Sequence, residues 1–326
     1  EIRENIAQKR SDVRVQTEVQ NDSDAARTVV VKQEVVDRSD NTLVASFASE
    51  PTVVEANSTA VVDTKSDYIQ NIKLWSPEEP NLYRVYTTIY DGEGNPIDLF
   101  ESPLGFRWAQ FLNDAFYLNG EKTVLFGANV HQDHAGWADA VTNEGFYRDV
   151  QMVKDAGMNF IRGSHYPHDP AFSDACDELG MMFWSEAVFW GAGGSSHPED
   201  RITYTAADWV GSTYPQYAED EEAFNQSCLQ GLEDMIRINR NHPSIIIWSR
   251  ATSCSSPWAN PICRSARIWS TKCATWPTCW TPPARRAWAA CSARALTPWT
   301  SATWQATTAT AVPPSSRKRA KGCPAI

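Results

Sequence analysis

The sequence predicts a multidomain β plus α/β protein, with an immunoglobulin-like β-sandwich over residues 1–107 and the first half of a (β/α)8 TIM barrel over residues 108–249. Short strands with period-two hydrophobicity fill the first part, and apolar strand runs alternate with helices in the second. The composition then changes abruptly after Ser249, so we expect residues 250–326 to have no native fold.

The sandwich prediction rests on strand and turn signals. Residues 13–19 and 83–90 alternate with period two, and residues 27–36 are rich in β-branched side chains. Clusters of turn-forming residues separate these segments, at 21–24, 39–41 and 91–96. Several short strands at this spacing, without helical periodicity, are typical of an antiparallel sandwich.

The half barrel is predicted from four strand and helix units. We expect strands over 122–129, 158–162, 181–186 and 244–249, and helices over 144–156, 169–179 and 223–239. Polar residues at the carboxyl ends of these strands favour a barrel. An open doubly wound sheet is the alternative, but no Gly-rich phosphate loop follows the first strand, which counts against a nucleotide site.

Charge and composition exclude several classes of partner. All 40 Asp and Glu precede residue 250, together with 18 of the 29 Lys and Arg, and this acidic balance argues against nucleic acid or an anionic membrane surface. No apolar run is long enough to span a bilayer. Only Cys176 and Cys228 precede the tail, so we expect no disulfide framework. The chain starts at Glu1 without a signal-like segment, which predicts a fragment or processed form and assigns no compartment or oligomeric state.

Five stretches resemble glycoside hydrolase family 2, nearest the β-galactosidases, and together they extend over nearly all of residues 1–249. They are Leu74–Tyr83 (LWSPEEPNLY), Phe116–Gly120, Gly127–His134, Arg162–Pro167 (RGSHYP) and Asn241–Ser249 (NHPSIIIWS). In that family a sugar-binding jelly roll precedes the sandwich, and the barrel carries two catalytic glutamates. The resemblance implies retaining hydrolysis of a β-glycoside, a carbohydrate substrate and no cofactor.

Polar residues at the ends of the predicted barrel strands are the candidate substrate-binding set. In the (β/α)8 barrel these ends and the loops after them form the catalytic face. By resemblance, His131 and His165 line the sugar subsite; simple hydrogen-bonded loop histidines, or a zinc site that includes His134, are the alternatives. The set is Asn129, His131, Arg162, His165, Glu186 and Trp248, with no metal.

The roles of five side chains stay open between site and scaffold. Arg162 either holds a site carboxylate, for which Glu186 is the natural partner, or forms an ion pair that closes the barrel. Glu186 either binds sugar directly or supports the site. Trp184, Trp190 and Trp248 could form apolar platforms for sugar faces, although the Ile run before Trp248 favours a core position.

The tail resembles a coding frame read one base out of register. It holds 6 of the 8 Cys and 7 of the 14 Trp, but no Asp, Glu, His, Phe, Tyr or Met. Taking the third base of each codon with the first two of the next permits Gly-Asn-Glu from Arg250 onward, so the expected original chain runs Trp-Ser-Leu-Gly-Asn-Glu, with the acid/base glutamate at the position of Ser253. Residues 279–285 then decode to Leu-Asp-Pro-Thr-Arg-Pro. A genuine Cys/Trp-rich tail is the alternative.

These features predict a β-galactosidase-type glycosidase whose chain as written is inactive. The acid/base position holds Ser253, and we expect the nucleophile beyond the chain end. The alternatives are β-glucuronidase or β-mannosidase activity of the same family, or a non-catalytic carbohydrate-binding fragment.

Overall fold

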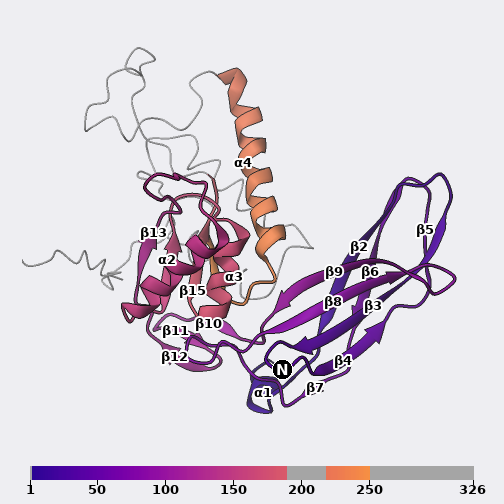
Figure 1. Cartoon of the computed structure of the whole chain (residues 1–326), viewed down its shortest axis with the longest axis horizontal. Helices are drawn as coiled ribbons and strands as arrows, with labels where there is room; N and C mark the ends of the chain where they lie inside the picture. Colours follow the sequence, from indigo (N-terminus) through magenta and orange to yellow (C-terminus); the bar gives the residue numbers. More distant parts are fainter. Residues whose placement is uncertain (1, 189–217, 250–326) are drawn as a thin grey trace, which may run out of the picture.

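The computed structural model describes residues 2–188 and 218–249, and Figure 1 shows the predicted sandwich and the predicted half barrel side by side. The predicted out-of-frame tail lies outside the described residues, as do Trp190 and Ser253. No helix in the described part of the chain is both long enough and apolar enough to cross a membrane.

The first part is an antiparallel sandwich. One sheet has the order β4-β3-β8-β9, with β5 also paired to β3, and it faces the pair β2-β6. The strands are β2 (Arg14–Asn21), β3 (Arg27–Asp37), β4 (Leu43–Ala48), β5 (Thr52–Val54), β6 (Ser58–Lys65), β8 (Tyr83–Tyr90) and β9 (Pro96–Leu104). A short pair, β1 (Arg10–Ser11) with β7 (Ile69–Gln70), and one helix, α1 (Ile2–Ala7), complete it. The sequence predicts a β-rich segment here and does not predict this helix.

The sandwich core is apolar except for a row of hydrogen-bonded polar side chains at its centre. A valine-rich cluster contains Val31 and Val54, and a second cluster is built around Val35 and Tyr83. Gln33 is fully buried; its amide donates to Thr17 Oγ1 at 3.2 Å and its carbonyl accepts from Thr87 Oγ1 at 2.6 Å. Because these polar atoms are paired with each other, burying them costs little.

The second part is a four-stranded parallel sheet in the order β13-β14-β15-β16. Neighbours in the chain are neighbours in the sheet, as in a singly wound barrel; the doubly wound alternative would reverse the strand order at some point. The strands are β13 (Gly127–Val130), β14 (Phe160–Gly163), β15 (Met182–Glu186) and β16 (Ile245–Ser249), joined through α2 (Asn143–Asp155), α3 (Pro170–Leu179) and α4 (Ala218–Asn239).

Local signals in the sequence start and stop the helices. Thr142 caps α2 by accepting the Gly145 N–H, and Asp169 caps α3 by accepting the Ala171 N–H. Gly180 ends α3 with φ of 65°, a left-handed conformation that suits glycine. The helices pack on the sheet through a core that includes Phe146, Val150, Ile161, Phe172 and Phe183.

The expected strand 122–129 is wrong, because the segment forms two short strands with a break between them. The first, β12 (Glu121–Thr123), joins β10 (Ala109–Phe111) and β11 (Phe116–Leu118) in a small antiparallel sheet. The second is β13. Between them, Asn159 holds the backbone: its carbonyl accepts from Phe126 N and its amide donates to Val124 O, both at 2.9 Å. These side-chain bonds replace the ladder bonds that a continuous strand would need.

Buried polar contacts join the sandwich to the half barrel. The indole N–H of Trp75 donates to Asp177 O at 2.9 Å, and Lys154 Nζ donates to Pro77 O at 2.7 Å. Arg107 donates to Pro243 O and Ile245 O, at 2.7 and 2.6 Å. Trp75 and Asp177 are almost fully buried, so their hydrogen bond is shielded from water. These contacts attach the sandwich to the end of the barrel opposite the predicted catalytic face.

Candidate active site

Three neighbouring strands bring the predicted polar side chains to one face. Asn129 on β13 is in register with Arg162 on β14, which is in register with Trp184 on β15. Because paired residues of parallel strands point to the same side of a sheet, these side chains share one layer. Glu186 lies two residues beyond Trp184 and points the same way, at the carboxyl end of its strand.

Glu186 is the centre of the group. Its side chain is fully buried, with Oε1 2.7 Å from Arg162 Nε and 2.6 Å from Arg162 Nη2, and Oε2 3.0 Å from His165 Nδ1. Cationic and imidazole donors thus meet both carboxylate oxygens, and such charge-assisted hydrogen bonds offset the cost of burying a charge. The sequence-based pairing of Arg162 with Glu186 is confirmed in geometry, whereas a direct role in sugar binding stays a prediction.

Trp184 lies against the same arginine. The Arg162 guanidinium carbon is 5.3 Å from the centroid of the Trp184 ring, within the range of a cation–π contact. The indole N–H of Trp184 is buried and has no hydrogen-bond partner within the described part of the chain. One face of Trp184 is therefore occupied by Arg162, which limits its use as a platform for sugar.

Two histidines and a tyrosine extend the group toward solvent. The rings of His131 and His165 meet edge to face with centroids 5.4 Å apart, and the Tyr166 hydroxyl lies 3.4 Å from His131 Nδ1. The same hydroxyl accepts the Gln132 N–H at 3.2 Å, and burial raises the pKa of Tyr166. His131 is exposed and His165 half-buried, so both imidazoles can reach a ligand.

His168 is a site-supporting residue that our sequence analysis missed. Its Nδ1 lies 3.1 Å from Tyr166 O and its Nε2 3.1 Å from Val130 O, so it ties together the loops after β13 and β14. Burial lowers the pKa of His168. The close approach leaves no room at Gly163, where a Cβ would lie 2.8 Å from His168 Nδ1. The signal was the second histidine of His165-Tyr166-Pro167-His168.

Two other candidates lie apart from this group. Trp248 packs in the apolar layer between the sheet and the helices, against Leu232 and Met235 of α4. His134 pairs with Asp149 of α2, Nε2 to Oδ2 2.7 Å. Within the described residues, His131 and His134 do not join a third side chain in a group that could hold a metal ion, so the zinc alternative gains no support.

One group of possible metal ligands does occur among the described residues, at the opposite end of the barrel. Asp174, Asp177 and His242 bring their ligand atoms within 4.8 Å of one another. Asp177 already accepts the Ser244 N–H at 2.9 Å and lies 2.7 Å from His242 Nδ1. Burial alone would lower the pKa of His242, but the hydrogen bond and charge of Asp177 raise it. Through Asp177, this group fixes the turn before β16. The backbone oxygen of the same Asp177 accepts the Trp75 indole N–H from the sandwich.

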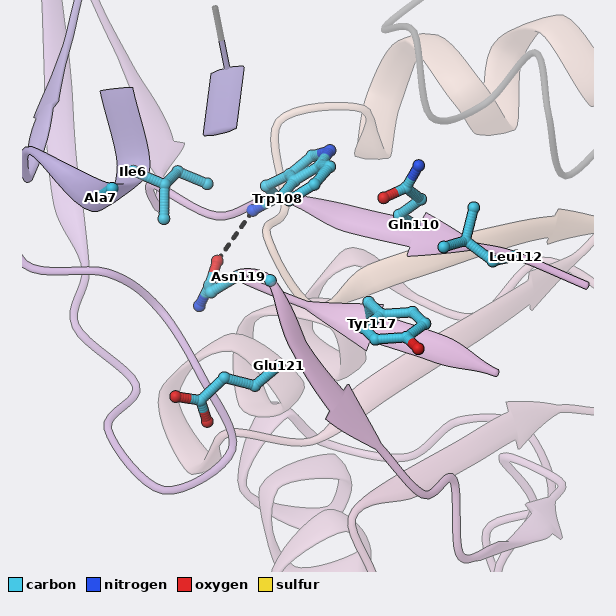
Figure 2. A pocket seen from close by; sticks show the side chains of 9 residues that line it. Ile6, Ala7, Trp108, Gln110, Leu112, Tyr117, Asn119 and Glu121 are labelled. Carbon is cyan, nitrogen blue, oxygen red and sulfur yellow. Dashed lines mark hydrogen bonds between the residues drawn. The ribbon is translucent and has the colours of Figure 1, made fainter. Parts of the chain in front are cut away.

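A hollow seen in Figure 2 also lies away from the predicted site residues. It is formed by α1 and the outer face of the β10-β11-β12 sheet, and its lining includes Trp108, Gln110 and Tyr117. Asn119 holds its rim by accepting the Trp108 N–H at 2.9 Å and donating to Trp75 O at 3.0 Å. The inner face of the same sheet packs into the barrel interior with Met182.

Two family models match this chain. The model described as glycosyl hydrolases family 2, TIM barrel domain, matches residues 110–261, and the model described as glycosyl hydrolases family 2 matches residues 1–107. Together they take in most of the chain and meet at the boundary between the sandwich and the half barrel.

Several proteins and solved structures that are similar to this chain are named either beta-glucuronidase or beta-galactosidase. A protein of Formosa agariphila that bears a beta-glucuronidase name is 37% identical over 194 residues, which cover 59% of this chain and 20% of that protein. A beta-galactosidase of Pseudoalteromonas haloplanktis is 31% identical over 188 residues, or 57% of this chain and 16% of that protein. The crystal structure of Bacteroides uniformis beta-glucuronidase is 30% identical with a TM-score of 0.61, covering 73% of this chain and 26% of that one. The chain thus spans a fifth or less of the length of these curated relatives.

Proposed function

The chain belongs to glycosyl hydrolase family 2, and from that premise we propose that it carries the sugar-binding side of a β-galactosidase-type active site. The observation that supports this most is Glu186, buried between Arg162 and His165 at the carboxyl ends of the barrel strands. This arrangement fixes His165, and through it the neighbouring His131, facing the space in which a sugar would lie.

The family reaction needs two carboxyl groups that flank the glycosidic bond. One protonates the leaving oxygen and the other attacks the anomeric carbon, at a separation of about 5–5.5 Å. In the described group the one carboxylate is Glu186, which is fully buried and bonded to Arg162 and His165. A nucleophile has to reach the substrate, so Glu186 suits a supporting role.

No Asp or Glu follows residue 249 in the sequence. Position 253, where we place the acid/base, holds Ser253, and residues 250–326 contain neither Asp nor Glu. We therefore propose that the 326-residue chain binds a β-galactoside through His131 and His165 but does not hydrolyse it.

Glucuronide is the alternative substrate, because two of the relatives bear that name. A glucuronide carries a carboxylate, which calls for a cationic partner in its subsite. The guanidinium of the group, on Arg162, is already engaged by Glu186. This favours the neutral galactoside. β-Mannoside hydrolysis, a third option within the family, gains no specific support from these contacts.

The test measures hydrolysis and binding on one preparation of the full chain, made in a host without β-galactosidase. We expect no release of nitrophenol from nitrophenyl β-galactoside above the blank, and calorimetric binding of methyl β-galactoside more tightly than methyl β-glucuronide. The matched control is His131→Ala with His165→Ala, which should abolish binding. Turnover of the galactoside, or tighter binding of the glucuronide, would overturn the proposal.

A further inference from the structure

The loop after β13 folds into a closed turn that presents one large aromatic side chain to solvent. His134 and Ala138 bond each other through both backbone groups, at 3.0 and 2.9 Å, and Trp137 N donates to His134 O at 3.1 Å. Ala138 has a φ of 48°, uncommon for a residue other than glycine. At the tip of this turn, Trp137 is 55% exposed.

The Trp137 ring rests on a fixed support. It stacks on the imidazole of His134, with 5.9 Å between centroids and 17° between planes. His134 is in turn held by Asp149 of α2, at 2.7 Å, and both side chains are mostly buried. The exposed ring is thus held by side-chain and backbone contacts before any ligand arrives, which lowers the entropy that binding would cost.

Tyr166 connects this turn to the proposed sugar site. Its hydroxyl accepts the Gln132 N–H and lies 3.4 Å from His131 Nδ1. Besides burial, the charges of Asp139 and Asp133 raise the pKa of the Tyr166 phenol. The turn begins at His134, three residues after His131, so it adjoins His131 and, through the hydroxyl contact, Tyr166.

A pyranose ring offers an apolar C–H face and a rim of hydroxyl groups, which suit an aromatic face and carboxylate acceptors. We propose that Trp137 is a stacking platform for the second sugar ring of a β-galactosyl disaccharide, with Asp133 and Asp139 accepting its hydroxyls. This rests on the proposed function, since the first ring would lie against His131 and His165. The turn would then favour ligands in which a second sugar follows the galactosyl ring.

The experiment compares two ligands on the full 326-residue chain by titration calorimetry. Methyl β-galactoside has one ring and tests the site at His131 and His165, whereas lactose has two rings and also tests Trp137. We expect lactose to bind about five- to tenfold more tightly, a gain typical of one good aromatic contact. The variants are Trp137→Ala, Trp137→Phe, and Phe100→Ala as a control on a sandwich side chain that is 68% exposed.

The inference predicts that Trp137→Ala removes the preference for lactose and leaves the affinity for methyl β-galactoside unchanged. Trp137→Phe should keep most of the preference and Phe100→Ala all of it. A preference that survives Trp137→Ala, or equal binding of both ligands by the unmodified chain, would overturn the inference while the proposed function stands. Binding of neither ligand would overturn both.

Discussion

At the scale of single residues, the ion pair between Arg162 and Glu186 is the most deeply buried charged pair of the site. The Glu186 side chain has no exposed surface and that of Arg162 only 21%. Removing one member of such a pair leaves the other charge buried and unpaired, which typically costs about 3–5 kcal/mol.

We therefore expect Glu186→Gln to lower the free energy of unfolding of the half barrel by several kcal/mol, about 3 on this scale. The matched control is Glu18→Gln, since Glu18 also pairs with an arginine, Arg237, but both side chains are about half exposed. Exposed pairs contribute about 0–1 kcal/mol. Urea unfolding of both variants measures the two losses of unfolding free energy. Equal losses would show that the burial of Glu186 does not determine its contribution to stability.

Sequence reasoning reached some of these residues and missed others. The sequence alone predicts the pairing of Arg162 with Glu186, because parallel strands end at one edge of a sheet. His168 and the platform at Trp137 were missed, because their roles arise from contacts between loops rather than from strand periodicity. Trp248 was placed in the candidate set by its strand end, yet its side chain packs toward α4.

At the scale of secondary-structure elements, the joint between α3 and the turn before β16 depends on the protonation of His242. Its pKa is raised in the folded chain because the hydrogen bond and charge of Asp177 outweigh the effect of burial. A raised pKa means that His242 stabilises the fold fully below its unfolded pKa of about 6.5, and that this contribution is lost as pH rises through the folded value. Asp174, Glu178, Arg38 and Arg107 are the other charged groups near this pair.

We expect His242→Gln to destabilise the chain more at pH 6 than at pH 9. Urea unfolding at both pH values, for the variant and the unmodified chain, measures the difference. A loss of stability that is the same at both pH values would mean that His242 acts by packing alone.

The other predicted strands and helices of the half barrel occur in the expected order and type, with errors at their ends, whereas one expected strand was wrong and one helix was missed. Helix α4 begins at Ala218 rather than 223, and the expected strand 122–129 is divided. The division depends on the Asn159 side chain, more than thirty residues away, which no local pattern in 122–129 reveals. Helix α1 was missed because six residues show less than two turns of periodicity.

At the scale of the whole molecule, the sandwich closes around its own core while the described barrel strands leave two edges. In the described sheet, β13 and β16 each pair on one side. Unpaired edges and an open apolar interior favour association with other chains. The sandwich instead holds two apolar clusters of its own.

We expect calorimetry of the full chain to show two unfolding transitions, the lower one from the half barrel. Trp75 couples the two parts through Asp177, so Trp75→Phe should lower the first transition more than the second. One cooperative transition for the whole chain would contradict this division.

The central claim is that the chain carries the sugar-binding side of a family 2 site and leaves the family's reading frame before the acid/base glutamate. The direct measurement is the nucleotide sequence that encodes residues 245–290. We predict that the neighbouring frame spells Gly-Asn-Glu from codon 250 onward and, later, Leu-Asp-Pro-Thr-Arg-Pro, so that restoring one missing base near codon 250 gives Trp-Ser-Leu-Gly-Asn-Glu after the Ile run. A sequence in which that frame spells neither phrase would contradict the claim and make the Cys- and Trp-rich tail a genuine part of the protein.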